Sequence, residues 1–207
     1  MPVVRKSGNE KKQKRELKKQ ELLRDAIATL SALGYARTSL RDIAKHSGVS
    51  VGVIHYYFED KEDLIEHCVS IYKQEFIEKL QQVTSSSQTC EELIDGFLDG
   101  LALAIRQNAE YHRLWYDIRS QAMFDPHFHA MTNEIETALV RLVDNFMNRA
   151  CKLANMPPSL DNLSFYLMLD GQFRYWLQQK LCAGVDDAPL KLKHALRANF
   201  AFLTKGL

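Results

Sequence analysis

Residues 47–64, SGVSVGVIHYYFEDKEDL, limit the folds open to this chain more than any other stretch. The segment before it, SLRDIAKH, has its apolar residues on one side of a short helix, and Asp42 stands three residues after Ser39 in a variant capping box. Gly48 then permits a tight turn, and a further short helix is predicted from about Ser50. Two short helices joined in this way form a helix-turn-helix, in which the second helix can enter the major groove of DNA.

The rest of the chain is predicted to be helical as well. It has only five prolines and nine glycines, almost no alternating strand pattern, and apolar residues that recur at spacings of three and four. The first helix is expected from about Gln13 to Gly34, and a fifth helix is expected to end before a sixth begins near Glu110. The polar run TSSSQT at 84–89 is the clearest interruption. We therefore expect an all-α fold of about nine helices, with an N-terminal three-helix domain and a larger C-terminal helical domain.

The net charge of +1 conceals an asymmetry between the two parts of the chain. Residues 1–61 carry 13 Lys and Arg against 7 Asp and Glu, which leaves 14 against 19 in the remainder. Opposite signs indicate different partners for the two parts. We expect a basic flexible arm at 1–15, a helix-turn-helix domain at 16–62 and a second domain at 63–207. The arm either reaches DNA phosphates or a minor groove, or is only a solvated end.

Several classes of protein are disfavoured by what the sequence lacks. No run approaches the roughly 18 apolar residues of a membrane span, and the N-terminus has no apolar block of a secretory signal, so we expect a cytoplasmic protein without a membrane partner. The four cysteines are scattered and are expected to be buried and reduced. They are Cys68, Cys90, Cys151 and Cys182.

An enzyme or metal protein is the first rival hypothesis. His127 and His129, with Asp125 nearby, could be imagined as metal ligands, but residues two apart on a helix point away from each other. There is no nucleophile motif and no phosphate-binding loop. We therefore expect no catalytic residue, no metal site and no cofactor. A second rival is a helical module whose basic arm binds anionic lipid or RNA, although the tight turn has no use in lipid binding.

The residues around the turn suit contact with DNA. Ser50 can cap the reading helix and donate to phosphate, and Gly52 removes side-chain bulk where a backbone approaches DNA. His55, Tyr56 and Tyr57 can meet phosphates or base edges. The alternative is that the aromatic residues only pack a small core, and we accept this alternative for the apolar anchors Ile54 and Phe58.

The stretch GYARTSLRDIAKHSGVSVGVIHYYFEDKEDL, residues 34–64, resembles the DNA-binding signature of the tetracycline-repressor (TetR/AcrR) family of bacterial transcriptional regulators. The resemblance implies that Thr38 and Ser39 contact phosphate and that Lys61 contacts the DNA backbone. It also implies a reading surface made of Ser50, Val51, Gly52, Val53, His55, Tyr56 and Tyr57. Family members commonly have tyrosine at His55 and a polar residue at Val51, so the family does not give the operator sequence.

The second domain contains aromatic stripes that suit either a plain core or a ligand cavity. Trp115 and Arg119 are four residues apart, and Asp170 interrupts an aromatic stripe, where burial would be costly without a cation. The resemblance implies an inducer in this domain, and we expect it at Tyr111, Trp115, Arg119, Tyr166, Asp170 and Phe173. Patterns such as LDGQF look most like choline-responsive members. Arg119 would repel a cationic ligand, so we do not adopt that ligand.

Two wide apolar surfaces near the C-terminus predict a dimer. Leu163, Leu167, Leu169 and Leu181 mark the eighth helix, and Leu192, Leu196, Phe200 and Leu203 mark the ninth. Paired with a second copy they could form an isologous four-helix interface, as the family does, or they could only cover their own domain. The combined hypothesis is a homodimeric regulator, most simply a repressor, which a small-molecule ligand releases from a palindromic double-stranded DNA operator.

Overall fold

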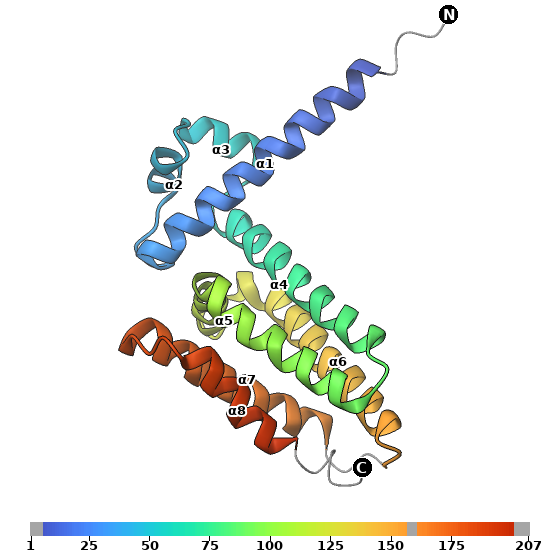
Figure 1. The fold of residues 1–207 in the computed structure, drawn as a ribbon. Helices are drawn as coiled ribbons and strands as arrows, with labels where there is room; N and C mark the ends of the chain where they lie inside the picture. Colours follow the sequence, from blue (N-terminus) through green and yellow to red (C-terminus); the bar gives the residue numbers. More distant parts are fainter. Residues whose placement is uncertain (1–5, 157–160, 201–207) are drawn as a thin grey trace, which may run out of the picture. The chain divides into compact units, whose positions relative to one another are not determined.

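The computed structural model describes residues 6–156 and 161–200, and all regular structure in these ranges is helical (Figure 1). This confirms the all-α fold class. The helices are α1 Lys6–Leu33, α2 Leu40–His46, α3 Val51–Tyr57, α4 Lys61–Ser86, α5 Cys90–Gln121, a 3-10 helix Pro126–Phe128, α6 His129–Leu153, α7 Asn162–Ala183 and α8 Ala188–Asn199.

The expected fifth and sixth helices form one element, α5, so the described residues contain eight α-helices instead of about nine. The predicted break survives as a kink at Asn108, whose backbone has φ −130° and ψ 26°. No proline or glycine lies near this position to end the helix, and one non-helical residue therefore bends it without interrupting it.

The chain divides into two compact units that do not coincide with simple sequence segments. The first unit contains the residues up to Ile71 together with Leu114–Phe128, and the second contains Tyr72–Arg113 and the residues from His129 onward. Helices α4 and α5 each contribute to both units. Compared with the domain limit expected after residue 62, the first unit also includes the first turns of α4, up to Ile71.

The core of the first unit contains apolar residues of α1, α2 and α3. The buried stripe of α1 includes Leu22, Ala26 and Leu30, and α2 and α3 contribute Ile43 and Ile54, all five at most 1% exposed. This is the packing that the spacing of apolar residues predicts. The helix-turn-helix therefore rests on α1 and on the beginning of α4.

Helix α1 begins at Lys6, earlier than the start near Gln13 that the apolar stripe indicates. Part of the segment expected as a flexible arm is thus helical. The sequence lacks a helix-breaking residue there apart from Gly8, and its lysines, glutamates and glutamines have good helix propensity. In Figure 1 the first turns of α1 extend past α2 and α3.

The second unit has an aromatic core and an ionic seam. The Phe97 and Phe146 rings lie 4.2 Å apart, and Phe200 contacts Phe146 at 5.3 Å. On the surface Arg197 of α8 pairs with Asp95 of α5. One turn away, Lys193 pairs with Asp99 at 2.6 Å. These pairs join α8 to α5, although exposed ion pairs contribute little stability individually.

Two glycines of α5 allow it to approach α4 closely. A Cβ atom at Gly96 would lie 2.7 Å from Val83 Cγ1, and one at Gly100 would lie 2.5 Å from Leu80 Cδ2. Any side chain at these positions would have to displace its neighbour. The spacing of four residues places both glycines on the same face of α5, and the glycine pair therefore sets the distance between the two helices.

The apolar residues of α7 and α8 are divided between the inside and the outside of the unit. Leu169, Leu192, Leu196 and Phe200 are buried, so they cover their own domain. By contrast, Leu163 and Leu167 are 50% and 53% exposed, and Leu181 is partly exposed. Leu203 lies outside the described residues. Only the exposed part of the predicted set is available to a partner.

The prediction that the cysteines are buried is confirmed for three of them and wrong for Cys182. Cys68, Cys90 and Cys151 are buried and free, whereas Cys182 is exposed. Burial raises the pKa of the Cys68 thiol, which disfavours the reactive thiolate. Within residues 6–156 and 161–200 no helix combines the length and apolar character needed to cross a membrane.

Candidate nucleic-acid interface and ligand cavity

The turn between α2 and α3 has the geometry that the sequence predicts. The Ser39 side chain accepts from the Asp42 backbone, while the Asp42 carboxylate accepts from the Ser39 backbone at 2.9 Å. Hydrogen bonds that the carboxylate accepts from the Ser39 hydroxyl, and secondarily from the Ser39 backbone, lower the pKa of Asp42. At the other end, Gly48 has φ +65°, a left-handed conformation that costs other residues about 1 kcal/mol or more. The two features fix the start of α2 and the direction of α3.

Helix α3 presents most of its surface to solvent. Ile54 is its one buried residue, and Ser50, Gly52, His55 and Tyr56 are exposed. The other predicted reading residues, Val51, Val53 and Tyr57, are partly exposed. All seven predicted reading residues are therefore brought together on or beside one short helix.

Two of these residues have features that favour contact with another molecule. Ser50 occupies the N-cap position of α3, but its side chain makes no capping hydrogen bond, so the hydroxyl is not committed to the helix. A Cβ at Gly52 would meet only the Ser50 Oγ atom, at 3.7 Å. Nothing in the fold of the first unit therefore requires glycine at this helical position, where glycine costs about 1 kcal/mol relative to alanine.

The aromatic end of α3 is ordered by its neighbours. Tyr56 is 64% exposed and meets Tyr57 edge to face, with ring centroids 4.9 Å apart. The Arg15 guanidinium carbon lies 5.3 Å from the centre of the Tyr56 ring. His55 Nδ1 lies 3.2 Å from the Glu59 carbonyl oxygen. The Tyr56 ring is thus held in place while most of its surface stays accessible.

Two predicted phosphate contacts are engaged within the fold. Thr38 is 3% exposed, and its hydroxyl donates to the Gly34 carbonyl at 2.7 Å, so it stabilises the turn after α1. The Lys61 ammonium donates to the Tyr35 carbonyl at 2.7 Å and lies 4.0 Å from the centre of the Tyr35 ring. Desolvation lowers the pKa of Lys61. The sequence alone does not reveal these internal partners.

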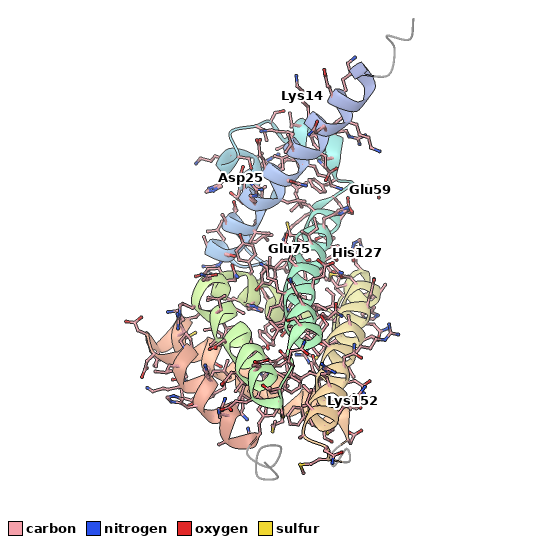
Figure 2. The ribbon with its side chains drawn as sticks, turned by 45° about the vertical axis from the view of Figure 1, so that its right-hand side comes forward. Lys14, Asp25, Glu59, Glu75, His127 and Lys152 are labelled. Carbon is pink, nitrogen blue, oxygen red and sulfur yellow. The ribbon has the colours of Figure 1, made fainter. Side chains whose placement is uncertain are left out.

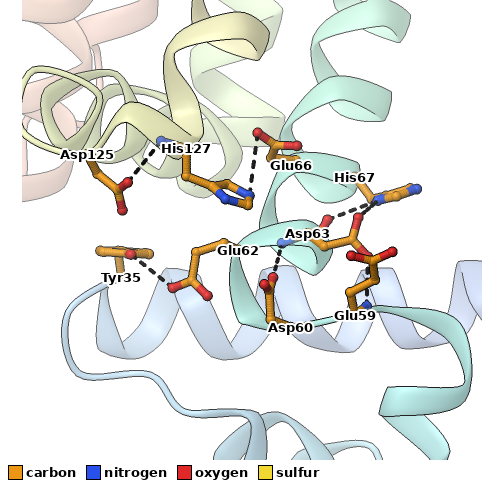
Figure 3. Close-up of polar contacts among 9 residues, drawn as sticks. All are labelled: Tyr35, Glu59, Asp60, Glu62, Asp63, Glu66, His67, Asp125 and His127. Carbon is orange, nitrogen blue, oxygen red and sulfur yellow. Dashed lines mark hydrogen bonds and ion pairs between the residues drawn. The ribbon is translucent and has the colours of Figure 1, made fainter.

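The start of α4 is acidic, as Figure 3 shows. The Asp60 carboxylate accepts from the Asp63 backbone at 2.7 Å, and Asp63 in turn accepts from the Glu59 backbone at 2.9 Å. Tyr35 donates to Glu62 at 3.2 Å, and burial and this carboxylate raise the pKa of Tyr35 to about 12. The helix N-terminus is therefore occupied by carboxylates of the chain, which would repel phosphate.

The predicted ligand residues are divided between the two units. Trp115 and Arg119 belong to the first unit, where Trp115 is 1% exposed. The other four belong to the second unit: Tyr111, Tyr166, Asp170 and Phe173. Tyr166 is buried and donates to Glu136 at 2.6 Å, and Asp170 is partly exposed. The structure brings Tyr111 and Phe173 into one aromatic cluster.

His112 is the centre of this cluster, and sequence reasoning missed it. The imidazole is 0% exposed, and its ring centre lies 5.0 Å from those of Tyr72 and Phe76 and 4.8 Å from that of Phe173. The Tyr72 hydroxyl bonds to His112 Nε2. Among the described residues Nδ1 has no hydrogen-bond partner. Tyr111 packs against Tyr72 at 4.8 Å.

A cavity of about 560 Å³ lies beside this cluster and is walled by α4 and α5. Tyr72 and Phe76 line it, so the residues that contact His112 also face the cavity. The rest of the wall is largely apolar, and exposed charged residues stand around it: Glu75, labelled in Figure 2, with Lys79, Asp99 and Arg106. Its size suits a small molecule with an apolar body.

The geometry of α2 and α3 defines a helix-turn-helix protein. Residues 22–68 match the sequence model of the bacterial regulatory proteins of the tetR family. The match covers the helix-turn-helix and parts of the helices on either side of it, and this part of the chain is therefore similar to the tetR family.

The chain is also similar to transcriptional regulators with known names. The probable HTH-type transcriptional regulator YttP of Bacillus subtilis is 34% identical over 71 residues, which is 34% of each chain. The HTH-type transcriptional regulator BetI of Stenotrophomonas maltophilia is 23% identical over 178 residues, or 83% of this chain and 86% of BetI. The chain thus matches only about a third of the length of the first relative.

Solved structures share the fold over nearly the whole chain. The fatty acid degradation regulator FadR of Bacillus halodurans superposes with a TM-score of 0.74 at 18% identity, covering 92% of this chain and 96% of FadR. FadR of Bacillus subtilis, solved in complex with stearoyl-CoA, gives a TM-score of 0.64 at 18% identity, covering 91% and 98%. At these identities the likeness concerns the fold alone.

We predict that His112 makes the protein acid-sensitive. Burial, and secondarily Lys73, lower the pKa of His112 well below its ordinary value of 6.5, so the folded protein holds it neutral. The unfolded chain takes up a proton below about pH 6.5, and the stability due to neutral His112 is lost as pH falls, by up to about 1.4 kcal/mol per pH unit. The free energy of unfolding is measured in urea between pH 7.5 and 5, about one to two units on either side of the ordinary pKa. Over this range the free energy of unfolding of His112→Asn should vary less with pH than that of wild type.

The exposed His194 of α8 provides the control. His194→Asn should keep the wild-type pH profile, because it leaves the buried His112 and every carboxylate in place. Parallel profiles for wild type and the His112 variant would contradict the prediction.

Proposed function

We propose that this protein is a sequence-specific DNA-binding transcriptional regulator, which represses by binding a palindromic operator and is released by a small molecule. The observation that carries the proposal is the exposed face of α3. Its Ser50 hydroxyl is uncommitted and its Gly52 has no role in packing. A slim, exposed helix of this kind suits close approach to a major groove. The bacterial regulators among the relatives support a cytoplasmic location.

We infer that the ligand enters the cavity between α4 and α5. The apolar wall suits a hydrocarbon body, and Lys79 and Arg106 suit an anionic head at the rim. One structural relative was solved with stearoyl-CoA, a ligand of this amphipathic kind. Helix α4 also begins beside α3, so displacement of α4 by a ligand is a direct way to change the position of the reading helix.

We further infer that α7 and α8 form a homodimer interface. Leu163, Leu167 and Tyr175 of α7 and Leu190 of α8 are between 48% and 54% exposed. The buried residues of α7, such as Phe165 and Leu169, lie on another face of the same helix. A self-complementary patch of this kind favours a two-fold dimer, and two reading helices about 34 Å apart would then fit successive major grooves.

The first prediction from this proposal concerns Gly52→Ala. The new methyl group fits the isolated fold and should raise stability by up to about 1 kcal/mol, yet it should weaken DNA binding by about 1–3 kcal/mol, the scale of one good base contact. Affinity is measured by fluorescence anisotropy on a duplex selected from a random pool, and stability by urea unfolding. If selection from the random DNA pool yields no preferred palindrome, the proposed function is contradicted. Unchanged affinity in a stable Gly52→Ala variant would show that Gly52 does not lie in the DNA interface.

The second prediction concerns the ligand. Stearoyl-CoA should bind wild type in isothermal titration calorimetry, and Lys79→Gln and Arg106→Gln should each weaken binding several-fold, because an exposed charge pair contributes about 0.2–1 kcal/mol. Lys191→Gln, on α8 and away from the cavity, is the control. No binding to wild type would reject this ligand class. If all variants bind stearoyl-CoA equally, the ligand does not bind beside Lys79 and Arg106.

The third prediction concerns the dimer. Leu167→Glu places a charge in the apolar patch and should convert dimer to monomer, since burying each leucine contributes about 1.5–3 kcal/mol and symmetry repeats the change. Leu17→Glu on α1 changes a leucine that is 55% exposed and should leave the dimer intact. Sedimentation velocity distinguishes the species. A wild-type monomer, or a dimer of the Leu167 variant with unchanged affinity, would contradict the interface.

A further inference from the structure

One stripe of α1 changes from apolar to basic along its length. Leu22, Ala26 and Leu30 are buried against the first unit at spacings of four. Continuing toward the N-terminus at spacings of three and four, the same stripe contains Lys19, Arg15 and Lys12. Residues at these spacings share one face of a helix. The side of α1 that forms the core therefore becomes positively charged where the helix extends past it.

Two contacts show where this basic part of the stripe points. The Lys19 ammonium lies 5.3 Å from the centre of the Phe58 ring, and the Arg15 guanidinium carbon lies 5.3 Å from that of Tyr56. Phe58 caps α3 and Tyr56 belongs to its last turn. The basic side chains thus lie beside the end of the reading helix, and Lys12 continues the row one turn further along.

The opposite face of α1 has a different character. Glu10, Lys14, Leu17 and Glu21 follow one another at spacings of four, three and four. Glu21 accepts from Lys18 at 2.9 Å, so that lysine is neutralised within the helix. In the part of the chain that the structure describes, no carboxylate lies within ion-pair distance of Lys12 or Arg15. On the side of α3 the cations therefore follow one another, whereas on the opposite face Lys14 stands between Glu10 and Leu17.

The chemistry of Arg15 suits two simultaneous contacts. A guanidinium group can lie against an aromatic ring and still direct N–H donors outward in its plane. Phosphate is the ligand that such a fork binds best. Arg15 can hold the Tyr56 ring and bind phosphate at once, whereas Lys12 and Lys19 offer single ammonium groups.

We propose that Lys12, Arg15 and Lys19 form a basic stripe on α1 that binds the phosphate backbone beside the groove read by α3, and that Arg15 also positions Tyr56. This inference rests on the proposed DNA-binding function and adds a surface to it. The stripe extends the contact with the duplex beyond the helix-turn-helix. Because it touches phosphate, it adds affinity for every sequence, while Tyr56 contributes to the choice among sequences.

The test uses two lysines that differ mainly in the face of α1 on which they stand. Lys12→Gln should make the slope of log K against log salt shallower by about 0.9, the value for one lost phosphate contact, whereas Lys14→Gln should leave it unchanged. Lys14, labelled in Figure 2, lies on the opposite face of the same exposed turns. Binding of the full-length protein is measured by anisotropy from 50 to 200 mM salt, the range over which phosphate contacts are commonly resolved, on the selected duplex and on a scrambled one.

The outcomes separate this inference from the function on which it rests. If wild type binds neither duplex, the proposed function fails. If wild type binds and the two lysine variants have the same slope, the stripe is rejected while DNA binding stands. Melting temperatures equal to that of wild type show that neither change acts through unfolding.

The positioning role of Arg15 is tested by a double-mutant cycle. Arg15→Gln should lower the preference for the selected duplex over the scrambled one, and Tyr56→Ala should have a smaller effect in the Arg15→Gln background than in wild type. Lys12→Gln should lower affinity for both duplexes equally. Independent effects of the Arg15 and Tyr56 substitutions would show that Arg15 only binds phosphate and would overturn its positioning role.

Discussion

The burial of Ile54 is the contact on which the reading surface depends. Helix α3 has seven residues, too few to be stable alone in water, and Ile54 is the one residue that it buries. Phe58, at its C-cap, is 2% exposed and supplies a second anchor. Because so little of the helix is used for packing, nearly all of its surface remains for recognition. A longer, better buried helix would be more stable and would offer less surface to DNA.

Local signals in the sequence were sufficient to predict the helix-turn-helix. The capping box between Ser39 and Asp42 acts over three residues, and the left-handed turn at Gly48 needs one glycine, so both can be read directly from the chain. The exposure of Ser50 and Tyr56 also followed, because a short helix with one apolar anchor leaves the other faces free. These features depend on neighbours within a few residues.

Features that depend on distant partners could not be predicted in this way. Lys61 reads as a free cation beside a helix, but its ammonium binds the carbonyl of Tyr35, 26 residues away. The sequence alone does not single out His112, because the rings that enclose it are supplied by α4 and α7. The break expected before Glu110 is only a kink at Asn108 within the single element α5.

The charges around the end of α3 give the docking surface a direction. On one edge stand Arg15 and Lys19, stacked on the rings of Tyr56 and Phe58. At the start of α4, next in the chain, the Asp60 carboxylate accepts from the Asp63 backbone and the Asp63 carboxylate accepts from the Glu59 backbone. A polyanion is attracted by cations and repelled by carboxylates. The basic stripe therefore offers a bound phosphate backbone a more favourable contact than the acidic start of α4 does.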